Sequence, residues 1–172
     1  MPSAQDRDAS VSPGSAAEGV CASGAGDRTL REAVELLFFA YRDFTRDADV
    51  LLGRYGFGRA HHRVIYFVGR RPGITVGDLL SILQITKQSL ARVLSQMMSG
   101  GFIVQRLDPG DRRRRRLYLT PEAQLLEQTL TERQVARIAS ARDCVGEGAA
   151  QGFRAMLLAM INAHDRQRFS KD

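Results

Sequence analysis

The sequence contains few cysteines and no candidate membrane-spanning segment. Only two cysteines, Cys21 and Cys144, occur among its 172 residues. That is too few, and too widely spaced, for a disulfide framework, which favours a reducing cytoplasm. No apolar run approaches the ~18 residues that cross a bilayer, and no basic-then-apolar leader opens the chain. We therefore expect a cytoplasmic protein with no membrane partner.

Residues that carry chemistry are also scarce. The sequence has three histidines, no glycine-rich phosphate loop and no Ser/His/Asp arrangement, so we expect no catalytic residues and no enzyme. His61 and His62 are neighbours on a predicted helix, where their side chains diverge by about 100°. Further ligands do not stand at a recognisable spacing. The sequence therefore predicts satisfied or surface histidines, no metal site and no cofactor.

Positive charge is concentrated in the middle third of the chain. The formal net charge is +6, but residues 59–116 hold twelve basic and three acidic residues, a local charge of +9. The remaining residues carry a net charge of −3. Such an asymmetry is the electrostatic footprint expected of a protein that binds nucleic acid.

The first half of the chain is predicted to begin with a tail and a long helix. Residues 1–28 are rich in Ser, Ala and Gly and nearly free of large apolar residues, which predicts a disordered tail. Apolar residues then recur at spacings of three and four, which predicts an amphipathic helix from its cap at Thr29 to about Leu52. Residues 53–58 break this helix.

The remainder is predicted to be mainly α with a small β wing. The expected helices are residues 59–69, 76–83, a helix from its cap at Thr86 to Gly100, 121 to about 144, and 149–166, and the expected strands are 74–75, 102–108 and 114–120. Thr86 is a suitable N-cap, and Thr120 caps a helix with Pro121 at its first position. The last two strands form a hairpin around Pro109 and Gly110.

One capped helix and the hairpin after it suggest the partner. In the helix that follows Thr86, the residues opposite the apolar stripe are polar or small: Lys87, Gln88, Ala91, Arg92, Ser95 and Gln96. Arg and Lys recognise guanine, and Gln recognises adenine, in the major groove. The hairpin adds five consecutive arginines, residues 112–116. The combination predicts double-stranded DNA as the partner.

A short helix, a tight turn, a capped helix and a cationic hairpin make up the winged helix-turn-helix arrangement. With two helices before it and two after it, the chain resembles the MarR family of bacterial transcription regulators over roughly Leu30 to His164. The most specific residues are Asp111-Arg112-Arg113 with Leu119-Thr120, supported by residues 72–80 and 101–104. Residues 61–69 are similar to those of a proteobacterial branch that includes regulators linked to photosynthetic electron-transport genes.

The resemblance implies a winged helix-turn-helix fold and a DNA-binding regulator. We expect residues 54–120 to bind DNA and residues 29–53 and 121–168 to dimerise, because apolar stripes on the terminal helices otherwise lack a partner. A homodimer then requires a pseudo-palindromic operator, and we expect steric repression. The expected DNA-binding residues are Thr86, Lys87, Gln88, Ser89, Arg92, Gln96, Arg106, Arg112, Arg113 and Arg114.

Within the hairpin, we expect different arginines to have different targets. Arg112 or Arg113 is expected to enter a narrow minor groove, while residues 114–116 touch phosphates or face outward. In relatives, an Asp–Arg pair at the positions of Asp111 and Arg113 braces the wing. Residues 114–116 replace the small and aliphatic wing residues of the family, and Gln105 replaces a common Arg, so no relative's sequence preference can be transferred.

The family also implies an effector pocket at the hinge, lined from the first, second and fifth helices. We expect an aromatic or anionic small molecule there, and the candidate residues are Phe38, Tyr41, Arg42, His62, Arg63 and Tyr66. Two alternatives remain open. One is redox sensing through Cys21 or Cys144, and the other is a helical protein-interaction module that does not bind DNA.

Overall fold

The computed structural model describes residues 23–111 and 113–169. The chain forms two units, Met1–Tyr41 and Arg42–Asp172, and each is described by itself. Helix α1 (Ser23–Gly53) begins in the first unit and ends in the second. The predicted cap at Thr29 is wrong, because residues 23–28 are already helical. An ion pair of 3.0 Å between Asp27 and Arg31, one turn apart, supports this early start.

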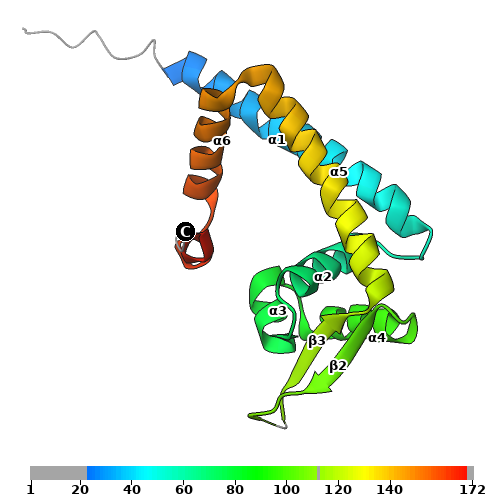
Figure 1. Cartoon of the computed structure of the whole chain (residues 1–172). Helices are drawn as coiled ribbons and strands as arrows, with labels where there is room; N and C mark the ends of the chain where they lie inside the picture. The colour runs from blue at the N-terminus through cyan, green and yellow to red at the C-terminus, as the bar shows by residue number, and fades with distance from the viewer. Residues whose placement is uncertain (1–22, 112, 170–172) are drawn as a thin grey trace, which may run out of the picture. The chain divides into compact units, whose positions relative to one another are not determined.

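The second unit is mainly helical with one small sheet, which confirms the expected fold class (Figure 1). Its elements after α1 are α2 (Arg59–Arg70), β1 (Ile74–Thr75), α3 (Val76–Leu83), α4 (Lys87–Ser99), β2 (Ile103–Leu107), β3 (Arg115–Leu119), α5 (Pro121–Val145), α6 (Glu147–Met160), α7 (Ala163–Arg166) and the 3₁₀ helix η1 (Gln167–Phe169). The hairpin of β2 and β3 projects beyond α2, α3 and α4 (Figure 1).

Threonine side chains begin three of these helices. The Oγ1 atom of Thr86 accepts a hydrogen bond from the backbone N–H of Ser89 at 3.1 Å, and Thr120 caps α5 in the same way. Both predicted caps are therefore confirmed. Thr75 caps α3 as well, with a reciprocal bond from its own N–H to the Asp78 carboxylate. Such caps satisfy N–H groups that the helix itself leaves without an acceptor.

The sheet is antiparallel with the strand order β1-β3-β2. Ile74 pairs with Leu117, and Ile103 pairs with Leu119; all four side chains are buried against the helices. Gly73 turns the chain into β1 with a φ of +86°, a conformation that side chains rarely adopt. A Cβ atom there would also lie 3.0 Å from the hydroxyl of Tyr118, so this turn requires glycine.

The core lies within the second unit and joins the end of α1 with α2, α3, α4, the sheet and α5. Its largest fully buried side chains are Leu52, Val64, Ile65, Val68, Leu79, Leu90, Met97, Leu117 and Leu130. The predicted apolar stripe of α4, which consists of Leu90, Val93, Leu94 and Met97, is buried as expected. This packing fixes which face of α4 points to solvent, because the opposite face is all that remains exposed.

The C-terminal segment departs from the single predicted helix over residues 149–166. Helix α6 ends at Met160 because Ile161 is extended, with φ −72° and ψ 138°. The carbonyl of Asn162 then accepts bonds from Asp165 and Arg166 and starts α7. Arg166 also donates to the carbonyls of Ala159 and Ile161, which have lost their helical partners.

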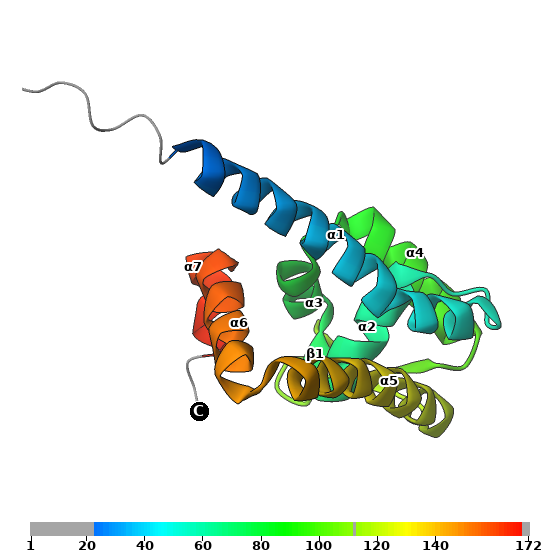
Figure 2. The ribbon, with the colours of Figure 1, turned by 90° about the horizontal axis from the view of Figure 1, so that it is seen from above.

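The junction between α5 and α6 was predicted only in part. Gly146 has a φ of +85° and separates the two helices, as expected. Helix α6 begins at Glu147, two residues before the predicted start at residue 149, so Gly148 lies inside the helix. Figure 2 shows that α6 leaves α5 in a new direction.

Large apolar side chains remain exposed on the C-terminal helices of the single chain. Ile138 of α5 is 53% exposed, because it lies beyond the part of α5 that covers the core. On α6, Phe153, Met156 and Met160 are each more than half exposed. Among the described residues, none of the helices combines the length and apolar character needed to span a membrane.

Candidate nucleic-acid interface

The solvent face of α4 holds the side chains expected to read DNA. Lys87, Gln88 and Arg92 are exposed and lie opposite the buried stripe. Thr86 and Ser89 are also exposed, but their side chains form the helix start, with the Thr86 hydroxyl donating to Ser89 Oγ at 2.8 Å. The long polar side chains are therefore the ones left available to a ligand.

Gln96, another expected DNA contact, is held by a buried histidine. His61 Nδ1 accepts a hydrogen bond from the backbone N–H of Gly58 at 3.1 Å. The proton of the neutral ring must then be on Nε2, which donates to Gln96 Oε1 at 2.9 Å. Phe57 stacks on the imidazole, with ring centres 4.6 Å apart and planes 6° apart. His61 therefore orients the Gln96 amide.

The base of the wing is fastened by Asp108, a residue that the sequence did not single out. Its carboxylate accepts a bond from the backbone N–H of Gly110 at 2.8 Å and one from Arg116 Nε at 2.6 Å. These contacts hold the pKa of the Asp108 carboxyl below its ordinary value, the Gly110 bond most strongly. Arg116 was expected to touch phosphate or face outward; in the structure its guanidinium is paired with the carboxylate of Asp108, and contact with phosphate stays a prediction.

Asp111 makes different contacts from the expected brace. Its Oδ1 atom accepts a hydrogen bond from the backbone N–H of Arg113 at 2.9 Å, and its Oδ2 atom lies 3.5 Å from Arg114 Nε. The side chain that pairs with the Asp111 carboxylate is therefore that of Arg114, not that of Arg113. Arg113, Arg114 and Arg115 are exposed, and Arg112 lies outside the described residues.

Two arginines face each other across the hairpin. Arg106 of β2 is directly opposite Arg116 of β3, an arrangement that is destabilising for two like charges. Asp108 pairs with Arg116, while the Arg106 guanidinium lies 5.0 Å from the centre of the Tyr118 ring. Such cation–π contacts are favourable. The exposed Arg106 therefore keeps its charge at the surface beside α4.

The expected effector residues fall in both units of the chain. Phe38 and Tyr41 belong to the first unit, whereas Arg42, His62, Arg63 and Tyr66 belong to the second. His62 is buried, and burial lowers the pKa of its imidazole, which nearby Arg63 lowers further while Asp49 and Glu127 oppose the shift. Tyr66 is half-buried, and Arg63 is exposed. The pocket itself stays a prediction.

The remaining expectations concern thiols and metals. Cys144 is an exposed free cysteine near the end of α5, and Cys21 lies outside the described residues. Across residues 23–111 and 113–169, no group of three or more His, Cys, Asp or Glu side chains is placed to hold a metal ion.

The fold and the exposed face of α4 beside a cationic hairpin define a winged helix-turn-helix protein. The model of the MarR family matches residues 55–114. The chain is 43% identical over 143 residues to the HTH-type transcriptional regulator PetP of Rhodobacter capsulatus, covering 83% of this chain and 86% of the relative. The chain belongs to the MarR family.

Solved structures share the fold. The DNA complex of FabT from Streptococcus pneumoniae has a TM-score of 0.67 at 18% identity, covering 76% of this chain and 94% of that one. A MarR family regulator from Silicibacter pomeroyi has a TM-score of 0.63 at 21% identity, covering 77% and 92%. Transcription regulators of this family are non-enzymatic DNA-binding proteins, and membership therefore confirms that the chain is not an enzyme.

Proposed function

We propose that this protein is a homodimeric, sequence-specific DNA-binding repressor of transcription. The observation behind the proposal is that hydrogen bonds join α4 to the wing. The backbone N–H of Phe102 donates to Met97 at the end of α4, and the Thr120 hydroxyl donates to Gly101 at 2.8 Å. These bonds tie both ends of the hairpin to α4, so the helix and the wing meet DNA together.

The exposed side chains divide into base-reading and phosphate-binding groups. Lys87, Gln88 and Arg92 on α4 have the donors and acceptors that read bases in the major groove. The arginines of the wing, Arg106, Arg113 and Arg114 together with Arg112, neutralise phosphates or enter the minor groove. Residues 54–120 would then be the DNA-binding region.

Dimerisation is the role proposed for residues 29–53 and 121–168. Exposed Phe153, Met156 and Met160 on α6 form a large apolar surface, which a stable soluble monomer rarely leaves open. A second copy of the same helices would cover it around a twofold axis. Two α4 helices related in this way fit half-sites about 10 base pairs apart, and therefore a pseudo-palindromic operator.

Regulation by a small aromatic or anionic effector completes the proposal. The effector would change the spacing of the two α4 helices so that both cannot dock on one operator. Phe38, Tyr41, Arg42, His62, Arg63 and Tyr66 remain the candidate residues for its site. The protein would act in the cytoplasm, where its DNA is found.

The experiment is a selection of duplexes from a random pool, followed by gel shifts at low and moderate salt. We expect retained duplexes to share a pseudo-palindrome, and wild-type protein to bind it more tightly than random DNA. If the protein retains no duplex at either salt concentration, the proposal is wrong, and the alternative of a protein-interaction module is favoured.

A further inference from the structure

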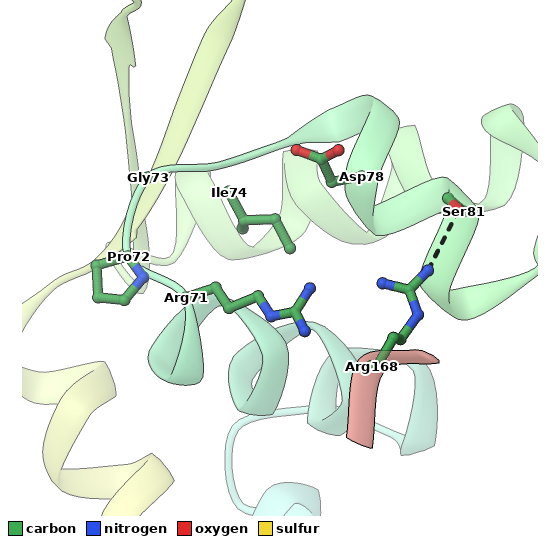
Figure 3. Close-up of a pocket in the computed structure, with 7 residues that line it drawn as sticks. All are labelled: Arg71, Pro72, Gly73, Ile74, Asp78, Ser81 and Arg168. Atoms are coloured by element: carbon green, nitrogen blue, oxygen red, sulfur yellow. Dashed lines mark hydrogen bonds between the residues drawn. The ribbon is translucent and has the colours of Figure 1, made fainter. Parts of the chain in front are cut away.

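A cavity of about 280 Å³ lies where the C-terminal segment meets the winged helix (Figure 3). It is lined by Arg71, Pro72, Gly73 and Ile74 from the turn between α2 and β1 and from β1 itself, by Asp78 and Ser81 from α3, and by Arg168 from η1. Tertiary packing therefore builds this cavity from segments that are far apart in the sequence. It does not include the candidate effector residues.

Two guanidinium groups point toward one another across this cavity (Figure 3). Arg168 is held in place, since its Nε atom donates to Asp165 at 2.8 Å and its Nη2 atom lies 3.5 Å from Ser81 Oγ. Its side chain is only 25% exposed. For Arg71, among the residues that the structure describes, no carboxylate lies within ion-pair distance.

The carboxylate in the lining, that of Asp78, already accepts hydrogen bonds. Asp78 Oδ2 accepts bonds from the hydroxyl of Thr75 at 2.7 Å and from the Thr75 N–H at 3.3 Å, as part of the cap of α3. Asp165, outside the lining, pairs with Arg168. Among the described residues, the Arg71 guanidinium thus has no carboxylate partner, although it faces a second guanidinium across a partly enclosed space. A bound anion would supply the Arg71 guanidinium with a counter-charge.

We propose that a small oxyanion, a carboxylate or a phosphate, binds between Arg71 and Arg168. A planar guanidinium donates two parallel N–H bonds to either group, and the Ser81 hydroxyl can donate a third. Pro72 and Ile74 provide an apolar wall for the rest of an organic ligand. The cavity is slightly smaller than most ligand pockets, which suits a compact anion.

Such a ligand joins two parts of the protein with different proposed roles. Arg168 follows α6, the proposed dimerisation helix, whereas Arg71 is the C-cap of α2 within the proposed DNA-binding region. An anion held by both residues fixes the winged helix relative to the dimer scaffold and so changes DNA affinity. This regulatory consequence rests on the proposed function, but binding of the anion does not.

Binding is tested on the full chain by calorimetry and thermal unfolding with inorganic phosphate and with benzoate, at constant ionic strength set by chloride. We expect saturable binding and a rise in Tm with at least one probe, and the tighter probe identifies the headgroup. Arg71→Ala and Arg168→Ala should each weaken binding at least tenfold. Arg70→Ala is the matched control, an exposed arginine outside the lining, and should bind within twofold of wild type.

Arg71→Ala is the informative variant if Arg168→Ala loosens the C-terminal segment, because Arg71 makes its bond to Phe67 through its backbone. The site does not exist if neither probe saturates, or if Arg71→Ala and Arg70→Ala bind equally well. DNA affinity with and without the bound probe is measured separately. An unchanged affinity overturns the regulatory part, while saturable anion binding by a protein that binds no DNA leaves the site intact and removes the proposed function.

Discussion

His61 Nε2 lies 2.9 Å from Gln96 Oε1 and so joins the start of α2 to the solvent face of α4. The bond uses the carbonyl end of the Gln96 amide and leaves its NH₂ group directed elsewhere as a donor. Since the Gly58 N–H fixes the tautomer of His61, the orientation of Gln96 is set by residues outside α4.

The first prediction is that these two residues act as one unit in DNA binding. His61→Ala should weaken specific binding about 2- to 10-fold, the range for loss of one hydrogen bond. In a Gln96→Ala background, the same change should have little further effect. A double-mutant cycle on DNA affinity measures this coupling. His164→Ala, at an exposed histidine of α7, is the control; strictly additive effects of His61→Ala and Gln96→Ala would contradict the prediction.

The second prediction concerns the brace of the wing. Asp108→Asn should loosen the hairpin, because Arg116 then faces Arg106 without a full counter-charge. Hydrogen exchange at the Gly110 amide should become faster, and DNA affinity should fall at low salt. Asp111→Asn is the matched control, since Asp111 is exposed and lies farther from its arginine partner. The account of the brace fails if Asp111→Asn has the larger effect on hydrogen exchange.

The third prediction concerns the pH dependence of stability. Burial lowers the pKa of His62 in the folded protein, so the unfolded chain binds a proton first as the pH falls. The stability that the neutral His62 side chain contributes is then fully present above about pH 6.5, the ordinary histidine pKa. This contribution is lost as the pH falls from that value to the lowered pKa of His62. The lowered pKa of Asp108 acts in a separate window, below about pH 4.

Urea unfolding between pH 7.5 and pH 4.5 tests the histidine window. Wild type should lose stability as the pH falls, and His62→Gln should show a flatter profile over the same range. His164→Gln is the control and should follow the wild-type profile. If the free energy of unfolding changes with pH equally in wild type and His62→Gln, groups other than His62 cause the pH dependence.

The fourth prediction concerns the exposed apolar surface of α6. Met156→Glu should convert a dimer into a monomer, because a carboxylate cannot be buried against a second apolar helix without a large desolvation cost. Gln151→Glu adds the same charge to an exposed polar position of the same helix and should remain dimeric. Sedimentation velocity measures both. Monomeric wild-type protein at micromolar concentration would show that α6 has another partner.

Sequence reasoning succeeded where the determining interactions are local. The caps at Thr86 and Thr120 and the buried stripe of α4 depend on residues within two turns of one another, and all are confirmed. The predicted boundary at Thr29 was wrong because this threonine lies inside α1, where Asp27 and Arg31 form an ion pair one turn apart. The break at Ile161 was missed because the apolar spacing continues through it.

Contacts between distant segments could not be predicted in this way. His61 and Gln96 are separated by 35 positions, and Arg71 and Arg168 stand still farther apart. Within the wing, the pairing of Arg116 with Asp108 rather than with Asp111 depends on strand register, which the sequence leaves open. The five consecutive arginines therefore predicted a cationic wing correctly, but not which of them Asp108 neutralises.

The central claim is that α4 reads bases while the wing binds backbone, and the salt dependence of affinity on selected and random duplexes tests it most directly. Arg113→Ala should weaken binding on both duplexes and reduce the salt slope by about 0.9, the value for one phosphate contact. Arg92→Ala should weaken the selected duplex more than the random one, while Arg70→Ala should match wild type. Equal losses on both duplexes for Arg92→Ala, with an unchanged slope for Arg113→Ala, would contradict the account.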